Sequence, residues 1–213
     1  MKRNSIHITV LTIGLIAIII WILELKHGKV PLTDQITRGL VEEVAGTRVY
    51  TFFRGMTELG GKSFVFPFVI VMMVILWIAY KKVFPAIIFG FGTLGASVLN
   101  RFIKHLIARE RPSISKELDA LGFSFPSGHA VTSIVCYGLL AYFLSERFPK
   151  QKLSIRIFFG ILIVLIGSSR YFINVHYLTD VITGFFVGYL YILLLIFLYK
   201  NIQTRRTYEK WFF

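Results

Sequence analysis

Two histidines stand at the edges of long apolar stretches. His129 lies in the stretch FPSGHA, and His176 is followed four residues later by Asp180. Residues four apart share one face of a helix, so the Asp180 carboxylate can hold one ring N–H of His176. The other ring nitrogen is then available as a base or a nucleophile. An ordinary surface pair has the same spacing, so this pair does not decide the matter by itself.

The stretch FPSGHA also has the features of an anion site. Pro126 suits the first turn of a helix, because the amide that it lacks would have been unpaired there. Ser127, Gly128 and His129 would present backbone N–H groups at the positive end of that helix, with a hydroxyl group beside them. Gly128 would let an anion approach the backbone closely. A histidine at a helix start is more often structural than catalytic, so the prediction depends on what lies nearby.

Two further stretches supply positive charge. In KHLIARERP, Lys104 and Arg111 are seven residues apart, so on a continued helix they share a face, and Pro112 then ends that helix. In SRYFINVHYLTD, Ser169 and Arg170 end an apolar run just before His176. Basic side chains that snorkel at the end of a membrane span would explain Lys104 and Arg111 equally well.

The elements that must position these residues are membrane spans. Of the 213 residues 55% are hydrophobic and 16% are charged, and the mean hydropathy is +0.69. Each of six apolar runs is long enough to cross a hydrocarbon core of ~30 Å as a helix. We predict an all-α polytopic membrane protein, with a single domain over residues 1–213 and spans at 6–23, 63–80, 83–103, 126–144, 157–172 and 181–199. Its one cysteine, Cys136, excludes an intramolecular disulfide and a cysteine metal site.

The basic residues predict the orientation of the spans. If the N- and C-termini are cytoplasmic, short cytoplasmic loops and tails hold twelve of the 24 Lys and Arg residues. The ends of the third and fifth spans and the starts of the fourth and sixth then meet at the outer face. Cations there that oppose the positive-inside rule are Arg101, Lys104, Arg109, Arg111, Lys116 and Arg170. An outer pocket for a phosphate dianion would explain them, and would join Lys104, Arg111 and Arg170 to His129, His176 and Asp180.

The segment 31–60, between the first two spans, alternates charges with apolar residues at helical spacing. It predicts one or two interfacial helices on the outer membrane surface, ended by Gly60 and Gly61. Such helices could cap the bundle, or could guide a lipid substrate. Glycines within the third and sixth spans, at 90, 92, 95, 184 and 188, predict close helix packing inside the chain, and leave dimerisation open.

Taken together, Lys104-x6-Arg111-Pro112, Pro126-Ser127-Gly128-His129 and Ser169-Arg170-x5-His176-x3-Asp180 resemble the three-part signature of the type 2 phosphatidic acid phosphatase superfamily. The six-span layout is similar to that of its bacterial lipid phosphatases. The resemblance implies catalysis through a phosphohistidine: His176 as nucleophile, Asp180 as its orienting group, and His129 as acid and then base. It also implies a phosphate site made by Lys104, Arg111, Ser127, Gly128, Ser169 and Arg170.

The resemblance further implies a phosphorylated membrane lipid as substrate, most simply phosphatidylglycerophosphate converted to phosphatidylglycerol at the outer face. Undecaprenyl pyrophosphate is an alternative or second substrate, and phosphatidate remains open. The family often has Gly and Pro around the histidine of its third motif, where this chain has Asn174 and Leu178. That departure would alter the stiffness of the loop or the fit of the headgroup.

Three other functions fit less well. A metal at His129, His176 and Asp180 would be repelled by three nearby cations and would have only three ligands, so we expect no cofactor. A passive anion or lipid transporter would need polar residues deep within the spans. The formal charge of +13 could suggest nucleic acid, but in a membrane chain we expect the lipid bilayer as partner instead.

Overall fold

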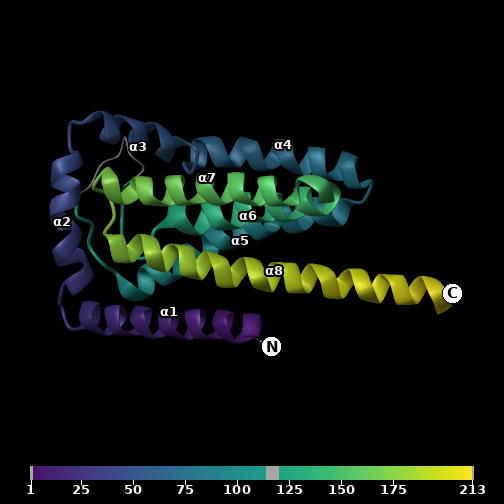
Figure 1. The fold of residues 1–213 in the computed structure, drawn as a ribbon, viewed down its shortest axis with the longest axis horizontal. Coiled ribbons are helices and arrows are strands. Elements are labelled where there is room, and N and C mark those ends of the chain that lie inside the picture. The colour runs from purple at the N-terminus through teal and green to yellow at the C-terminus, as the bar shows by residue number, and fades with distance from the viewer. Residues whose placement is uncertain (1, 114–119, 213) are drawn as a thin grey trace.

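The computed structural model describes residues 2–113 and 120–212, and its regular secondary structure there is entirely helical (Figure 1). Six of the described helices are long and apolar enough to cross a membrane. They are α1 Lys2–Lys26, α4 Lys62–Tyr80, α5 Val83–Ile107, α6 Gly128–Arg147, α7 Lys152–Phe172 and α8 Leu178–Phe212, with the short 3-10 helix η1 Pro149–Gln151 before α7. The predicted all-α fold with six spans is confirmed.

Helix α6 is the central element of the bundle. In the apolar stretch of α6 that could span a membrane, 67% of the residues are buried. In the corresponding stretch of α1 only 6% are buried, and α1 packs loosely against α5 and α8. Phe89 of α5, Leu139 and Phe143 of α6 and Leu195 of α8 form the core between the helices. The exposed apolar faces of α1, α4 and α7 suit lipid contact, because a bilayer solvates such surface.

Two amphipathic helices, α2 Leu32–Val44 and α3 Arg48–Glu58, cover one end of the bundle (Figure 1). Thr47 caps α3 by accepting a hydrogen bond from the Tyr50 N–H at 3.4 Å. The hydroxyl of Tyr171 in α7 donates to the Thr37 carbonyl, which ties α2 to the bundle. The predicted segment 31–60 therefore contains two helices, and both chain termini lie toward the opposite end.

Glycines allow helix α8 to approach its neighbours closely. A Cβ atom on Gly184 would lie 2.7 Å from the Ser127 carbonyl oxygen, and one on Gly188 would lie 3.0 Å from that of Val131. In α5, a Cβ atom on Gly90 would lie 2.2 Å from the sulfur of Met73 in α4. Each contact is under the ordinary van der Waals distance. A side chain at Gly184 would meet a backbone atom, whereas one at Gly90 would meet the flexible side chain of Met73. The predicted use of these residues in packing within the chain is confirmed.

The predicted continuation of α5 to Arg111 is wrong. The helix ends at Ile107, because Ala108 adopts a left-handed conformation with φ of +54° while its N–H bonds to the Lys104 carbonyl at 2.8 Å. This closure is a common helix terminus. Arg111 therefore lies in the connection to α6, and Pro112 does not end the helix.

Two helix starts also differ from the prediction. Helix α6 begins at Gly128 with Ser127 as its N-cap, so Pro126 lies outside the first turn. The reason is the extended backbone of Ser127, with φ of −67° and ψ of 117°, and its N–H donates to the Asp180 carbonyl of α8 at 2.9 Å. Helix α8 begins at Leu178, so His176 precedes it and is placed by a turn.

Candidate active site

His176 lies in the turn between α7 and α8, and its side chain is buried. The backbone N–H groups of Val175 and His176 both donate to the Arg170 carbonyl at 3.1 Å. Asn174 has a φ of +60°, a conformation that asparagine adopts more readily than most residues. Asparagine can therefore form this turn, although the family often has glycine in this region.

Hydrogen bonds define the protonation of the His176 ring. Arg111 Nη1 lies 2.9 Å from Nε2, and Asp180 Oδ2 lies 3.3 Å from Nδ1. A guanidinium group can only donate, so Nε2 must accept and the proton must reside on Nδ1, facing the carboxylate. The predicted contact between His176 and Asp180 is present, although a turn and not a helix creates it. The nitrogen with the lone pair is Nε2.

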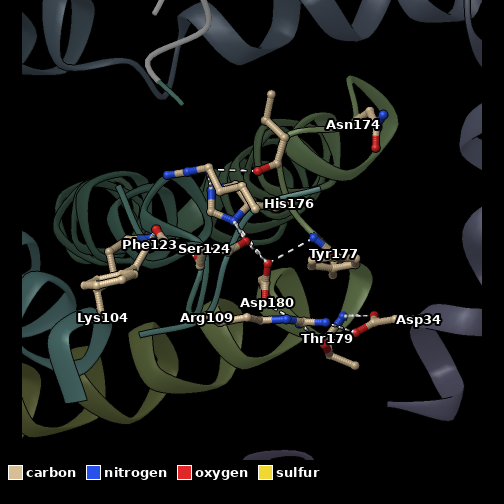
Figure 2. A network of polar contacts seen from close by, with 12 residues as sticks. Asp34, Lys104, Arg109, Phe123, Ser124, Asn174, His176, Tyr177, Thr179 and Asp180 are labelled. Carbon is tan, nitrogen blue, oxygen red and sulfur yellow. Dashed lines mark hydrogen bonds and ion pairs between the residues drawn. The ribbon is translucent and has the colours of Figure 1, made fainter. Parts of the chain in front are cut away.

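Asp180 is fully buried and accepts hydrogen bonds from several elements. Its Oδ2 accepts from the Tyr177 N–H at 2.9 Å and from the Ser124 hydroxyl, and Ser124 Oγ also lies 3.3 Å from His176 Nδ1. Its Oδ1 accepts from Arg109 Nη1 at 2.7 Å. These contacts fix the carboxylate from the backbone of the turn before α8, from the loop before α6 and from Arg109 (Figure 2).

Arg109 connects this carboxylate to a second one, in helix α2. Its Nη2 lies 2.7 Å from Asp34 Oδ2, and both side chains are buried. Thr179 donates to Asp34 through its hydroxyl at 2.7 Å and through its N–H at 3.0 Å. Figure 2 shows Asp180 between His176 and Arg109, with Asp34 beyond the guanidinium group.

Three of these residues, Ser124, Thr179 and Asp34, are not predicted by the sequence, and Arg109 is predicted only as an outer cation. A buried acid in an interfacial helix has no spacing signal that would link it to a site 75 residues away in the chain. The only available signal was the excess of outer cations, which needs acids to balance it. Lys116, another of these cations, lies outside the described residues.

The predicted cationic residues surround the histidine. Lys104 Nζ donates to the carbonyls of Phe123 at 2.6 Å and Ser124 at 2.8 Å. Besides His176, Arg111 contacts the Val175 carbonyl at 2.9 Å. Both side chains therefore hold the loops of the site in place.

Arg170 is almost fully buried, and its Nη1 donates to the hydroxyl of Thr57 in α3 at 2.8 Å. Ser169 donates its hydroxyl to the Ile166 carbonyl at 2.6 Å. Helix α3 thus reaches the site through Arg170, as α2 does through Arg109. The Ser169 bond is that of a hydroxyl at a helix end.

The N-terminus of α6 completes the cluster. Its N-cap Ser127 has a buried hydroxyl with no hydrogen-bond partner among the described residues. The N–H of Ser127 is used by Asp180, so of the three amides predicted for an anion only those of Gly128 and His129 remain in the first turn. A Cβ atom on Gly60 would lie 2.7 Å from His129 Cδ2, so the α3–α4 junction packs directly on this ring.

The electrostatic field of the site favours neutral imidazole at His176. Burial lowers the pKa of His176 well below its usual range, and the charges of Lys104, Arg111, Arg170 and Arg109 lower it further. His176, Arg170 and Arg111 also act electrostatically on His129, which places that ring in the same cluster. The arrangement offers a neutral imidazole nucleophile beside cations that can bind an anion. Within the described residues, no group of three or more His, Cys, Asp or Glu side chains could hold a metal ion.

Helix α2 also forms one wall of a cleft of about 600 Å³. The cleft is lined by the end of α1, by α2 and by Tyr177, and it includes Asp34 and Arg38. Arg38 Nη1 donates to Asn174 Oδ1 at 2.8 Å, so the cleft adjoins the turn that carries His176.

The sequence profile of the PAP2 superfamily matches residues 85–204, which include every residue of the three motifs. The chain belongs to the PAP2 superfamily. The predicted resemblance is therefore confirmed, and with it the expectation of a membrane phosphatase that hydrolyses phosphoric monoesters.

Two relatives from Bacillus subtilis support this membership. Phosphatidylglycerophosphatase B of strain 168 is 35% identical over 156 residues, which are 71% of this chain and 73% of the relative. The crystal structure of a transmembrane PAP2-type phosphatidylglycerolphosphate phosphatase superposes with a TM-score of 0.75 at 26% identity. That superposition covers 88% of this chain and 96% of the other, so the two proteins have the same overall fold.

Proposed function

We propose that this PAP2 phosphatase removes the terminal phosphate of phosphatidylglycerophosphate through a phosphohistidine on His176. The observation that carries the mechanism is the hydrogen bonding of His176, which leaves the lone pair of Nε2 toward Arg111 and the proton toward Asp180. The names of both relatives support the substrate. We further propose that residues 1–213 act as one domain, with the catalytic cluster on the outer face of a cell membrane and both termini in the cytoplasm.

In the first step, Nε2 of His176 attacks phosphorus in line with the departing lipid oxygen. The N–P bond forms as the P–O bond to the lipid breaks, and protonated His129 donates its proton to the leaving oxygen. Asp180 stabilises the positive charge that develops on the His176 ring by holding the Nδ1 proton. Because Arg111 donates to Nε2 in this structure, its guanidinium group must turn to the phosphate oxygens when substrate binds.

In the second step, His129 takes a proton from water, and the water oxygen attacks phosphorus. The N–P bond breaks, inorganic phosphate leaves, and His129 is again protonated for the next cycle. The loss of such acid–base assistance costs about 10²–10⁴ in rate.

The phosphate oxygens would be held by residues from three helix ends and from the connection after α5. Lys104, Arg111 and Arg170 supply charge, while the Gly128 amide and the Ser127 hydroxyl donate at the start of α6. The unpaired Ser127 hydroxyl supports this assignment, since buried hydroxyl groups normally have a partner. Ser169 belongs to the proposed set only if its hydroxyl turns away from Ile166.

The test is phosphate release by the purified protein in detergent micelles with EDTA present. Phosphatidylglycerophosphate, undecaprenyl pyrophosphate and phosphatidate are compared in parallel, and His176→Ala is measured beside the wild type. His27→Ala, at an exposed histidine, is the matched control. With substrate labelled in its terminal phosphate, we expect an acid-labile labelled protein from the wild type and the control, and none from His176→Ala.

Hydrolysis that persists in His176→Ala would remove the phosphohistidine mechanism. Faster hydrolysis of undecaprenyl pyrophosphate would reassign the substrate and leave the mechanism in place. If none of the three lipids releases phosphate, the proposed substrate class is wrong.

A further inference from the structure

Asp34 of helix α2 and Arg109 form a buried ion pair. Arg109 also binds Asp180, the carboxylate that contacts the proposed nucleophile His176. Asp34 and Arg109 are 3% and 8% exposed, and Arg109 binds Asp34 and Asp180 at 2.7 Å each. Breaking a buried pair of this kind leaves an uncompensated charge, which is strongly unfavourable. A surface helix therefore contributes a carboxylate to the interior of the catalytic end.

The geometry fixes the plane and the direction of the Arg109 guanidinium group. Its Cζ lies 3.8 Å from the centre of the Tyr177 ring, so one face is stacked. Nη1 points to Asp180 and to the Thr179 hydroxyl at 2.9 Å, and Nη2 points to Asp34. Arg109 thus occupies Oδ1 of Asp180 and leaves Oδ2 to face His176, Ser124 and the Tyr177 amide.

We propose that Asp34 is a positioning residue for the reaction at His176, because it orients Arg109 and offsets its charge so that Asp180 can hold the histidine. This inference rests on the proposed function, since it assumes that His176 is the nucleophile. Asp34 itself touches no reacting atom, and it acts through Arg109 and then Asp180.

The charges around His176 explain why the offset matters. The cations that face it are Lys104 from α5, Arg109 and Arg111 from the connection to α6, and Arg170 from α7, while His129 of α6 adds a further titratable ring. Asp180 of α8 is the carboxylate that contacts His176. Without the negative charge of Asp34, Arg109 would repel a protonated His176 ring more strongly and would attract Asp180 more strongly. Protonation of His176 would then be still less favourable, so the Nε2 lone pair would be less basic.

The test compares Asp34→Asn with the wild type over a range of pH, using phosphatidylglycerophosphate in micelles. We expect kcat to fall roughly tenfold, because small displacements of a reacting group have effects of this order or larger. KM should change little, because Asp34 does not touch the phosphate site. The acid limb of the kcat profile should move to lower pH. Glu43→Gln removes the same charge from the exposed side of α2, and should leave kcat and the limb unchanged.

A double-mutant cycle separates this role from a merely structural one. If Asp34 acts through Arg109, then Asp34→Asn should cause no additional loss of kcat in an Arg109→Gln background. Additive losses, or an acid limb that does not move, would overturn the proposal. Should Asp34→Asn fail to fold, Asp34→Glu keeps the charge and is used instead. The proposal requires that the glutamate variant keep the limb at the wild-type pH, and a limb that shifts would count against it.

The proposed function and the role of Asp34 can fail separately. If labelled His176 is not found in the wild type, the mechanism fails and the role of Asp34 fails with it. If the label forms on His176 but the acid limb of Asp34→Asn is unmoved, only the positioning role is lost.

Discussion

At the scale of single residues, the site depends on which nitrogen of His176 carries the proton. Arg111 can only donate and Asp180 can only accept, so the two together select the tautomer with the proton on Nδ1. Asp180 is in turn held by the backbone N–H of Tyr177, which places it at the start of α8. The ring orientation is therefore fixed by the fold, and the rearrangement needed before attack is that of Arg111, whose guanidinium group must leave Nε2.

The pH dependence of the reaction follows from the same surroundings. Burial and the four nearby cations lower the pKa of His176, so the ring is neutral at neutral pH and becomes protonated only in more acidic solution. Protonation removes the nucleophilic lone pair, so kcat/KM should fall as the pH drops through the lowered pKa. We expect this acid limb to lie below the ordinary imidazole value of about 6.5. The check is kcat/KM between pH 4 and pH 8, because kcat/KM reports the protein without bound substrate; a limb above 6.5 would contradict the role of His176.

Individual residues were predictable where several motifs agreed. Spacing and span parity predicted six residues that the structure brings into one cluster. They are Lys104, Arg111, His129, Arg170, His176 and Asp180. Ser124 and Asp34 were not, because each contacts Asp180 or Arg109 only through tertiary packing. A serine in a loop and an acid on an amphipathic helix are usually exposed to solvent, so their residue types alone do not predict a place in the site.

At the scale of helices, hydropathy predicted the spans but not their ends. The ends are decided by local backbone conformation: Ala108 is left-handed at the end of α5, and Ser127 is extended before α6. Ala108 takes a left-handed conformation that usually requires glycine or asparagine, and serine is common both before and inside a helix. The sequence therefore could not indicate that Arg111 leaves the helix or that Pro126 precedes it. With these two departures, Arg111 contacts the turn before α8, and Ser127 contacts α8 itself.

The contact between α8 and the start of α6 can be tested at Gly184. A Cβ atom there would lie 2.7 Å from the Ser127 carbonyl, a backbone atom that cannot move without displacing the proposed phosphate site. We expect Gly184→Ala to destabilise the protein by about 1–3 kcal/mol through overpacking and to lower kcat. Thermal unfolding in detergent and phosphate release measure the two effects.

Gly160→Ala is the matched control, because a Cβ atom on Gly160 of α7 has nothing within 4 Å. Alanine is the better helix former by about 1 kcal/mol, so this variant should be at least as stable as the wild type and fully active. Equal behaviour of the two variants would show that the close approach of α8 to Ser127 is not required.

At the scale of the whole molecule, one end of the bundle is chemically different from the other. α2 and α3 lie across it, and both reach buried arginines of the site, through Asp34 and Thr57. The sequence predicted interfacial helices there and left their role open between capping the bundle and guiding lipid. The contacts support the first role directly, since these helices hold Arg109 and Arg170 in place.

The proposed orientation of this end toward the outside can be tested with cysteine labelling, because the native Cys136 is buried and should not react. Glu43→Cys places a thiol on exposed α2 at the catalytic end, and Gln151→Cys places one in η1 between α6 and α7 at the other end. With a membrane-impermeant maleimide on intact cells, we expect Glu43→Cys to be labelled and Gln151→Cys to be labelled only after permeabilisation. The basic loop residues favour this arrangement, because lysine and arginine near span ends are retained in the cytoplasm. The reverse pattern would place the catalytic end inside, and the cations around His176 would then obey the positive-inside rule instead of opposing it.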